Sequence, residues 1–156
     1  MASQLRVDKI VPVDGVPSGG GGGIIQVKQS LYTTHATYTN TDFAALSGFT
    51  VAITPKFNTS KILITLNLCV EVRSASIICI QLTRGGSSIF TNLGGMRGDG
   101  TAQGGYISMT YLDSPASTSA LTYGVETKTS NSTYAINNYI GSGPTNSFLT
   151  VMEVSA

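Results

Sequence analysis

The sequence predicts an all-β protein, an antiparallel jelly-roll-like β-sandwich with an extended N-terminal arm. Apolar and polar residues alternate with a period of two through most of the chain, and clusters of Gly, Ser, Asn and Pro separate the alternating runs. No stretch shows the 3.6-residue period of a helix. At 156 residues the chain is long enough to bury one core. We divide it into an arm with a Gly-rich joint, residues 1–23, and a β-sandwich knob, residues 24–156.

The first element is a short amphipathic arm that ends in a run of glycines, Gly19–Gly23. Its apolar residues have no globular partner within the arm, so we interpret them as an anchor for a neighbouring subunit. They are Leu5, Val7, Ile10, Val11 and Val13. Fourteen extended residues reach about 45 Å, which is enough to cross from one subunit to the next. An arm, a flexible joint and a β-domain favour a protein that inserts into a larger assembly.

The knob reads as a series of short strands separated by turns. Two pairs are predicted to be hairpins, one turning at Arg73-Ser74-Ala75 and one at Ser130-Asn131-Ser132. Pro55 ends a strand because proline cannot donate to a sheet ladder. The predicted strands are residues 23–32, 43–54, 61–72, 76–84, 87–93, 105–112, 121–129, 133–140 and 148–154.

The two cysteines, Cys69 and Cys79, share a face if residues 61–72 and 76–84 form a hairpin. A disulfide is then geometrically possible. A reducing cytosol favours two free and partly buried thiols instead. The sequence leaves both states open.

The composition limits the kinds of molecule that we expect this protein to bind. Charged residues are 11% of the chain, against roughly 25% in an average soluble protein, and Ser and Thr take their place. Uncharged polar side chains can be buried between subunits at lower cost than ions, which favours an oligomer. A net charge of +1 without a basic cluster predicts no nucleic acid and no acidic membrane as partner. The sequence contains no apolar run long enough for a membrane helix and no segment that resembles a signal peptide. We therefore predict neither membrane insertion nor export.

Residues that catalysis needs are sparse. His35 is the only histidine, and no Gly-x-Ser-x-Gly motif accompanies it, so we interpret it as a surface residue. One histidine and two cysteines ten residues apart do not make a zinc site, and the acidic residues are too scattered for a calcium loop or a glycosidase pair. We predict no catalytic residue, no metal, no cofactor and no enzyme activity.

Four further features have a binding or an ordinary structural interpretation. The glycine-rich segments 94–104 and 141–146 are predicted to be exposed loops, and Arg97 and Asp99 are the candidate binding residues of the first. Arg97-Gly98-Asp99 matches an adhesion tripeptide, but a loop-tip turn with a local ion pair is the preferred interpretation. Arg84 is either a surface charge or part of an inter-subunit pair with Asp113 or Glu126. The tyrosines lie within strand patterns, which favours packing over sugar stacking.

Several short blocks, in order along residues 3–154, resemble small structural proteins of tailed-phage virions. They are Leu5-Arg6-Val7-Asp8-Lys9-Ile10, Phe49-Thr50-Val51-Ala52-Ile53-Thr54-Pro55, Thr59-Ser60-Lys61-Ile62-Leu63-Ile64, Leu82-Thr83-Arg84-Gly85, Tyr111-Leu112-Asp113-Ser114-Pro115-Ala116, Leu121-Thr122-Tyr123-Gly124-Val125-Glu126 and Val151-Met152-Glu153-Val154. The pattern is similar to that of tail-fibre and head-decoration proteins of phages that infect marine bacteria and cyanobacteria. The resemblance implies a virion component that is commonly trimeric.

These observations predict a non-enzymatic structural protein on the surface of a tailed-phage virion, assembled in the host bacterial cytoplasm. The preferred hypothesis is a trimeric capsid decoration or cement protein whose arm contacts other virion proteins, because 156 residues leave no room for a long fibre shaft. The alternative is a short tail fibre or knob that binds a host surface receptor. A C1q-like or lectin-like binding module is a third possibility.

Overall fold

The computed structural model describes residues 23–130, 133–138 and 145–155, and within them it contains ten strands and no helix. The strands are β1 (Ile24–Tyr32), β2 (Ala36–Tyr38), β3 (Ala44–Ile53), β4 (Lys61–Val72), β5 (Ile77–Arg84), β6 (Ser87–Arg97), β7 (Gln103–Asp113), β8 (Leu121–Thr129), β9 (Tyr134–Ile136) and β10 (Ser147–Val154).

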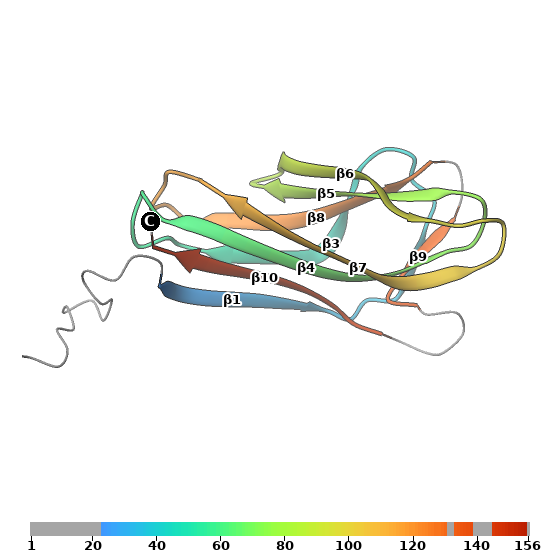
Figure 1. Ribbon diagram of the computed structural model, residues 1–156, viewed down its shortest axis with the longest axis horizontal. Coiled ribbons are helices and arrows are strands. Elements are labelled where there is room, and N and C mark those ends of the chain that lie inside the picture. The colour runs from blue at the N-terminus through green and yellow to red at the C-terminus, as the bar shows by residue number, and fades with distance from the viewer. Residues whose placement is uncertain (1–22, 131–132, 139–144, 156) are drawn as a thin grey trace, which may run out of the picture.

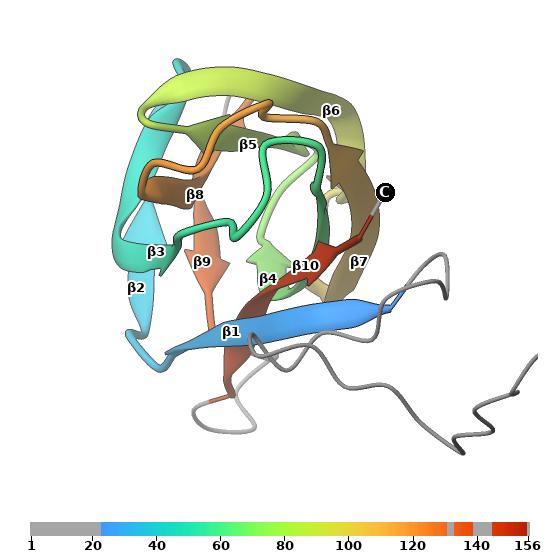
Figure 2. The ribbon, with the colours of Figure 1, turned by 90° about the vertical axis from the view of Figure 1, so that its left-hand side faces the viewer.

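The strands form two antiparallel sheets that face each other. One sheet, which we call the β1 sheet, has the order β1-β10-β4-β7, and the short strands β9 and β2 extend it beside β4. The other, the β3 sheet, has the order β3-β8-β5-β6. Figure 1 shows the two layers from the side, and Figure 2 shows them from one end. Numbered along the chain, the eight long strands stand in the orders 1-8-3-6 and 2-7-4-5, which is the jelly-roll arrangement, so the predicted fold class is confirmed.

The core lies between the sheets and follows the alternation of the sequence. On β4 the even-numbered residues from Ile62 to Val72 are all buried, because successive side chains of a strand point to opposite faces. They meet inward-facing residues of the other sheet, among them Phe49, Ile80 and Val125. The core therefore uses one face of each sheet and leaves the two outer faces to solvent or to partners.

The sandwich has two distinct ends. The chain enters the described region at Gly23 and leaves it at Ser155, and these two residues bond to each other through Gly23 N–H to Ser155 Oγ (3.1 Å) and Ser155 N–H to Gly23 O (3.0 Å). We call this the arm end; the connections 54–60, 85–86 and 114–120 also lie there (Figure 1). The opposite end, the loop end, carries the connections 33–35, 73–76 and 98–102.

Both predicted hairpins are wrong. β4 pairs with β10, β7 and β9, whereas β5 pairs with β6 and β8, so residues 73–76 cross from one sheet to the other. The same holds for β8 and β9, which lie in different sheets. Two strands that each bury one face alternate in the same way whether they pair or oppose each other. The alternation therefore could not distinguish a hairpin from a crossover.

The remaining differences are smaller. Residues 94–97, expected in a loop, continue β6 to Arg97, and β7 begins at Gln103. The short β2 was not predicted, and the strand expected at 133–140 is described only as β9. The anchoring residues Leu5, Val7, Ile10, Val11 and Val13, and the loop 139–144, lie outside the described residues. The arm and its boundary at residue 23 therefore stay predictions.

Candidate interaction face

The outer face of the β1 sheet is the most distinctive surface of the described chain. Its side chains stand in rows across β1, β10, β4 and β7, because the four strands pair in continuous antiparallel register. From the arm end towards the loop end, three successive rows are Val27–Met152–Leu63–Leu112, Gln29–Thr150–Thr65–Thr110 and Leu31–Phe148–Asn67–Ser108. None of these twelve side chains carries a charge.

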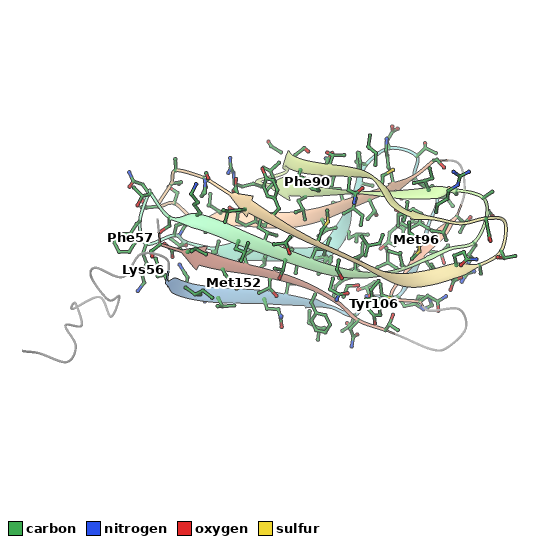
Figure 3. The ribbon with its side chains drawn as sticks, viewed as in Figure 1. Lys56, Phe57, Phe90, Met96, Tyr106 and Met152 are labelled. Atoms are coloured by element: carbon green, nitrogen blue, oxygen red, sulfur yellow. The ribbon has the colours of Figure 1, made fainter. Side chains whose placement is uncertain are left out.

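Near the arm end this face is mostly apolar, with the exposed Lys61 at its margin opposite Val154. Ile24, Val27 and Leu112 are 60%, 53% and 50% exposed, and the half-buried side chains of Met152 and Leu63 lie between the last two. We call these five residues the apolar band. It runs across all four strands, and Ile24 follows directly after Gly23, where the chain enters the sandwich. Figure 3 shows Met152 on this side of the molecule, between the arm end and Tyr106.

Towards the loop end the same face becomes polar and hollow. A depression of about 350 Å³ is lined by Thr65, Leu66, Asn67, Ser108, Met109, Thr110, Phe148 and Thr150. We call it the outer hollow. Phe148 is 38% exposed and stands beside Asn67 in the register of β10 and β4. The outer hollow thus combines one aromatic ring with five neutral hydrogen-bonding side chains.

The outer face of the β3 sheet differs in charge and in bonding. Thr91 Oγ1 donates to Gln81 Oε1 (3.1 Å), and Gln81 Nε2 donates to Glu126 Oε2 (2.9 Å), so polar side chains on three strands are tied to one another. Lys128 Nζ lies 4.8 Å from the centre of the Phe43 ring. This face therefore satisfies its polar groups internally and carries charges, as expected of a surface that stays in water.

The candidate loop residues Arg97 and Asp99 are both exposed at the loop end. The Asp99 carboxylate does not pair with Arg97 as predicted. It accepts bonds from Thr101 Oγ1 (2.7 Å), Thr101 N–H (3.1 Å) and Gln103 Nε2 (3.2 Å), and those bonds, with Thr101 foremost, lower the pKa of Asp99. Gly98 N–H donates to Ser76 O (2.9 Å), and a Cβ at Gly98 would collide with the Ser74 carbonyl oxygen. The glycine of this tripeptide is therefore explained by packing.

Arg84 is neither a free surface charge nor part of an inter-subunit pair. Its Nη1 bonds both carboxylate oxygens of Asp113, at 2.8 and 2.6 Å, within the same chain. The hydroxyl of Tyr123 donates to Asp113 Oδ2 at 2.7 Å. Because Asp113 belongs to the β1 sheet and the other two residues to the β3 sheet, this cluster joins the sheets at the arm end.

The cysteines are free and buried, and they lie in different sheets. Cys69 Sγ accepts a bond from Thr145 Oγ1 (2.9 Å), whereas Cys79 Sγ donates to Leu93 O (3.1 Å). The hairpin that would have brought them together does not exist, so the alternative of an intrachain disulfide is wrong. Burial raises the pKa of the Cys79 thiol above its ordinary value.

The described residues contain no candidate metal site. They hold no group of three or more His, Cys, Asp or Glu side chains that could bind a metal ion, and His35 is exposed. Of the tyrosines expected to be packed, Tyr123 and Tyr134 are buried, but Tyr106 is 51% exposed on the outer face of the β1 sheet. No helix in this part of the chain could span a membrane.

No protein-family model and no curated protein matches this chain. Similar solved structures include that of the infectious bursal disease virus Gx strain, at 12% identity and a TM-score of 0.49 over 99% of this chain and 45% of that chain. Mutant VP2 protein of that virus in derived T=1 particles gives 12% identity and a TM-score of 0.46, over 99% and 44% of the two chains. The T13 particle of the virus gives 11% and 0.44, over 99% and 42%. The chain thus spans less than half the length of these viral proteins.

The apolar band and the outer hollow were not predicted as sites. The signal was present in the sequence: in residues 63–67, 108–112 and 148–152 the outward residues are Thr, Asn, Ser, Phe, Met and Leu, where an ordinary solvent-facing strand would carry Lys or Glu. Placing those residues in common rows required the order β1-β10-β4-β7, which follows from the topology and not from any single strand.

Proposed function

We propose that this protein is a non-enzymatic structural component of a virion surface, a trimeric decoration protein held in place by its N-terminal arm. The observation that carries the proposal is the apolar band beside Gly23. An uncharged, half-exposed stripe across four strands begins at the point where the arm joins the sandwich. The arm and the apolar band then act together as one attachment surface.

The energetics favour coverage of the apolar band. Fully burying an aliphatic side chain stabilises a complex by about 1.5–3 kcal/mol, and the side chains of the band are roughly half exposed. Covering five of them contributes several kcal/mol for each subunit, which is enough to hold a partner once the arm has brought it close. A neutral surface also incurs little desolvation cost on contact with another virion subunit. These properties support attachment through the band.

The fold supports a structural role more than a catalytic one. A jelly roll presents a rigid surface on two packed sheets, and the described residues hold no group of three or more His, Cys, Asp or Glu side chains. Fold alone does not define function. The proposed function is therefore supported mainly by the attachment surface, together with the resemblance to phage virion proteins.

The alternative function is a short tail fibre that binds a host receptor. One observation favours it: the exposed Arg97 and Asp99 lie at the loop end, opposite the entry of the arm at Gly23. A protein anchored at the arm end would present these residues outwards. Decoration and receptor binding therefore predict different consequences of the same substitutions.

The decisive experiment compares particles that carry variants of this protein. Deleting residues 2–18, or changing Met152→Glu in the apolar band, should abolish incorporation while the purified protein stays folded. Leu93→Glu is the matched control, because Leu93 is 63% exposed on β6, which belongs to the β3 sheet. Normal incorporation of both attachment variants would overturn the proposal.

Copy number and adsorption separate the two functions. A decoration protein should be present at hundreds of copies per particle, and its removal should lower the resistance of the capsid to heat. The double change Arg97→Ala with Asp99→Ala should then leave adsorption unchanged. Tens of copies, together with reduced adsorption of the double variant, would instead establish the fibre function. Sedimentation of the purified protein should give a trimer, and a clean monomer at micromolar concentration would contradict self-association.

A further inference from the structure

The outer hollow lies on the same face as the apolar band but one to two rows closer to the loop end. Its walls come from three neighbouring strands: Thr65 and Asn67 on β4, Ser108 and Thr110 on β7, and Phe148 and Thr150 on β10. Paired strands hold these side chains at fixed spacing, so the hollow is built on the rigid part of the fold. A volume of about 350 Å³ is at the small end of the range for ligand sites.

Most polar side chains of the outer hollow have no partner within the described chain. Thr150 Oγ1 accepts a bond from Gln29 Nε2 (2.8 Å), but the side chains of Thr65, Asn67, Ser108 and Thr110 bond to no other described residue. The polar side chains on the opposite outer face, such as Gln81, are tied to neighbours. Four hydrogen-bonding groups directed to one depression therefore remain available to a bound molecule.

An aromatic surface completes the site. The Phe148 ring is 38% exposed at the edge of the outer hollow. Tyr106 is 51% exposed, on the same face of β7 as Ser108. Figure 3 shows Tyr106 on the outer side of this sheet, towards the loop end. An exposed ring provides an apolar platform beside the free hydroxyl and amide groups.

The chemistry of the lining selects a class of ligand. No Lys, Arg or His lines the hollow to hold a phosphate or a carboxylate, and no Asp or Glu lines it to hold a cation. A purely apolar ligand would leave the four polar groups unpaired, which costs about 1–3 kcal/mol for each group that becomes buried. The fitting ligand is neutral, carries many hydroxyl or amide groups and has one apolar side.

We infer that the outer hollow binds a neutral carbohydrate, with one sugar ring on Phe148 and its hydroxyl groups bonded to Asn67, Thr65, Ser108 and Thr110. A sugar ring has the required character, because its C–H groups form an apolar side and its hydroxyl groups both donate and accept. The inference is independent of attachment through the apolar band, since the two sites occupy different rows of the sheet.

The test titrates the full chain with maltohexaose, cellohexaose and N-acetylated chitotetraose. Binding is followed by calorimetry and by amide chemical shifts. At least one oligosaccharide should bind and shift the amides of residues 65–67, 108–110 and 148–150. Phe148→Ala should weaken that binding by about tenfold or more, and Asn67→Ala or Thr110→Val by about fivefold.

The matched controls lie outside the hollow. Phe90→Ala removes a ring of almost equal exposure, 36%, and Gln81→Ala removes a neutral amide from the other outer face; neither should change the affinity. Amide spectra establish that each variant is folded. The inference is overturned if none of the three sugars binds, if Phe148→Ala and Asn67→Ala both leave the affinity unchanged, or if the shifted amides lie elsewhere. Shifts of the same amides with protein concentration alone would also overturn it, since a second copy would then occupy the hollow.

Discussion

Arg84 and Asp113 join the two sheets of the sandwich at the arm end. Arg84 lies on β5 and Asp113 closes β7, and the carboxylate accepts bonds from Arg84 Nη1 and from the Tyr123 hydroxyl (2.7 Å). The bond that Arg84 donates to Asp113 raises the pKa of Arg84, whereas burial, followed by the bond to Asp113, raises the pKa of Tyr123. Arg84 therefore stays charged and Tyr123 stays neutral across the physiological pH range.

Asp113→Ala should lower the free energy of unfolding by about 2–4 kcal/mol. The change leaves the buried Tyr123 hydroxyl and the partly exposed Arg84 guanidinium without their acceptor. Tyr123→Phe removes a single bond and should cost about 1 kcal/mol. Urea unfolding followed by circular dichroism measures both. Asp42→Ala, at an exposed position, is the control, and an equal effect of Asp42→Ala and Asp113→Ala would contradict the role of the cluster.

Stability should fall in acid because of Glu153, which is fully buried on β10. Burial opposes ionisation of this carboxylate, but bonds from Gln26 Nε2 (2.6 Å), Lys56 N–H (2.7 Å) and Phe57 N–H (3.4 Å) outweigh that effect and lower its pKa. A carboxylate with a lowered pKa stabilises the fold at pH values above its pKa in the unfolded chain, which is about 4.3 for Glu. The stabilisation is lost as the pH falls through the folded value.

The measurement is the melting temperature between pH 6 and pH 3. The native protein should lose stability in the acid part of this range, and Glu153→Gln should be less stable at pH 6 but should depend less on pH. Glu126→Gln, on the partly exposed outer face of β8, is the matched control. A pH profile of Glu153→Gln that runs parallel to the native profile would contradict the assignment.

The positions of the strands along the chain were predictable because their alternation is local. The pairing of the strands was not predictable in this way. Residues 61–72 and 121–129 coincide with β4 and β8, since each buries every second side chain. The crossovers that follow β4 and β8 depend on which sheet each strand joins, a long-range property that no window of sequence contains. The pairing of Arg84 with Asp113 within one chain follows from those crossovers. So does the separation of Cys69 from Cys79.

Gly98→Ala should destabilise the loop end by about 2 kcal/mol, because the new methyl group would collide with the Ser74 carbonyl oxygen in the neighbouring connection. Hydrogen exchange should show the loss as faster exchange in residues 73–76 and 98–102. Gly100→Ala tests a glycine of another kind: its φ is 108°, but a Cβ there would meet no atom within 4 Å. Protection of residues 73–76 that survives in Gly98→Ala would contradict the packing explanation.

Both thiols should stay reduced and unreactive in the folded protein. Cys69 and Cys79 are buried in different sheets, and burial raises the pKa of Cys79, which lowers its thiolate fraction. Iodoacetamide should therefore label neither thiol quickly in the native protein and should label both in urea without reductant. Mass spectrometry provides the readout. A urea-unfolded sample that takes up label only after reduction would reveal a disulfide and contradict the fold at β4 and β5.

Asn137 holds the segment after β9 against the end of β1, and its substitution separates backbone strain from hydrogen bonding. Its φ is 55°, in the left-handed region, and its Nδ2 donates to Tyr32 O (2.8 Å) and Thr34 O (3.1 Å). Its Oδ1 accepts a bond from Ser147 Oγ (2.6 Å).

The variant Asn137→Ala loses these bonds and strains the backbone, so it should lower the free energy of unfolding by about 3–4 kcal/mol. Asn137→Gly loses the same bonds without that strain and should be about 1 kcal/mol more stable than the alanine variant. Chemical denaturation of the two proteins gives the difference directly. Equal stability of the two variants would show that the left-handed backbone carries no cost for alanine here, and native stability of both would remove the bonds from any role in holding β1 to β9.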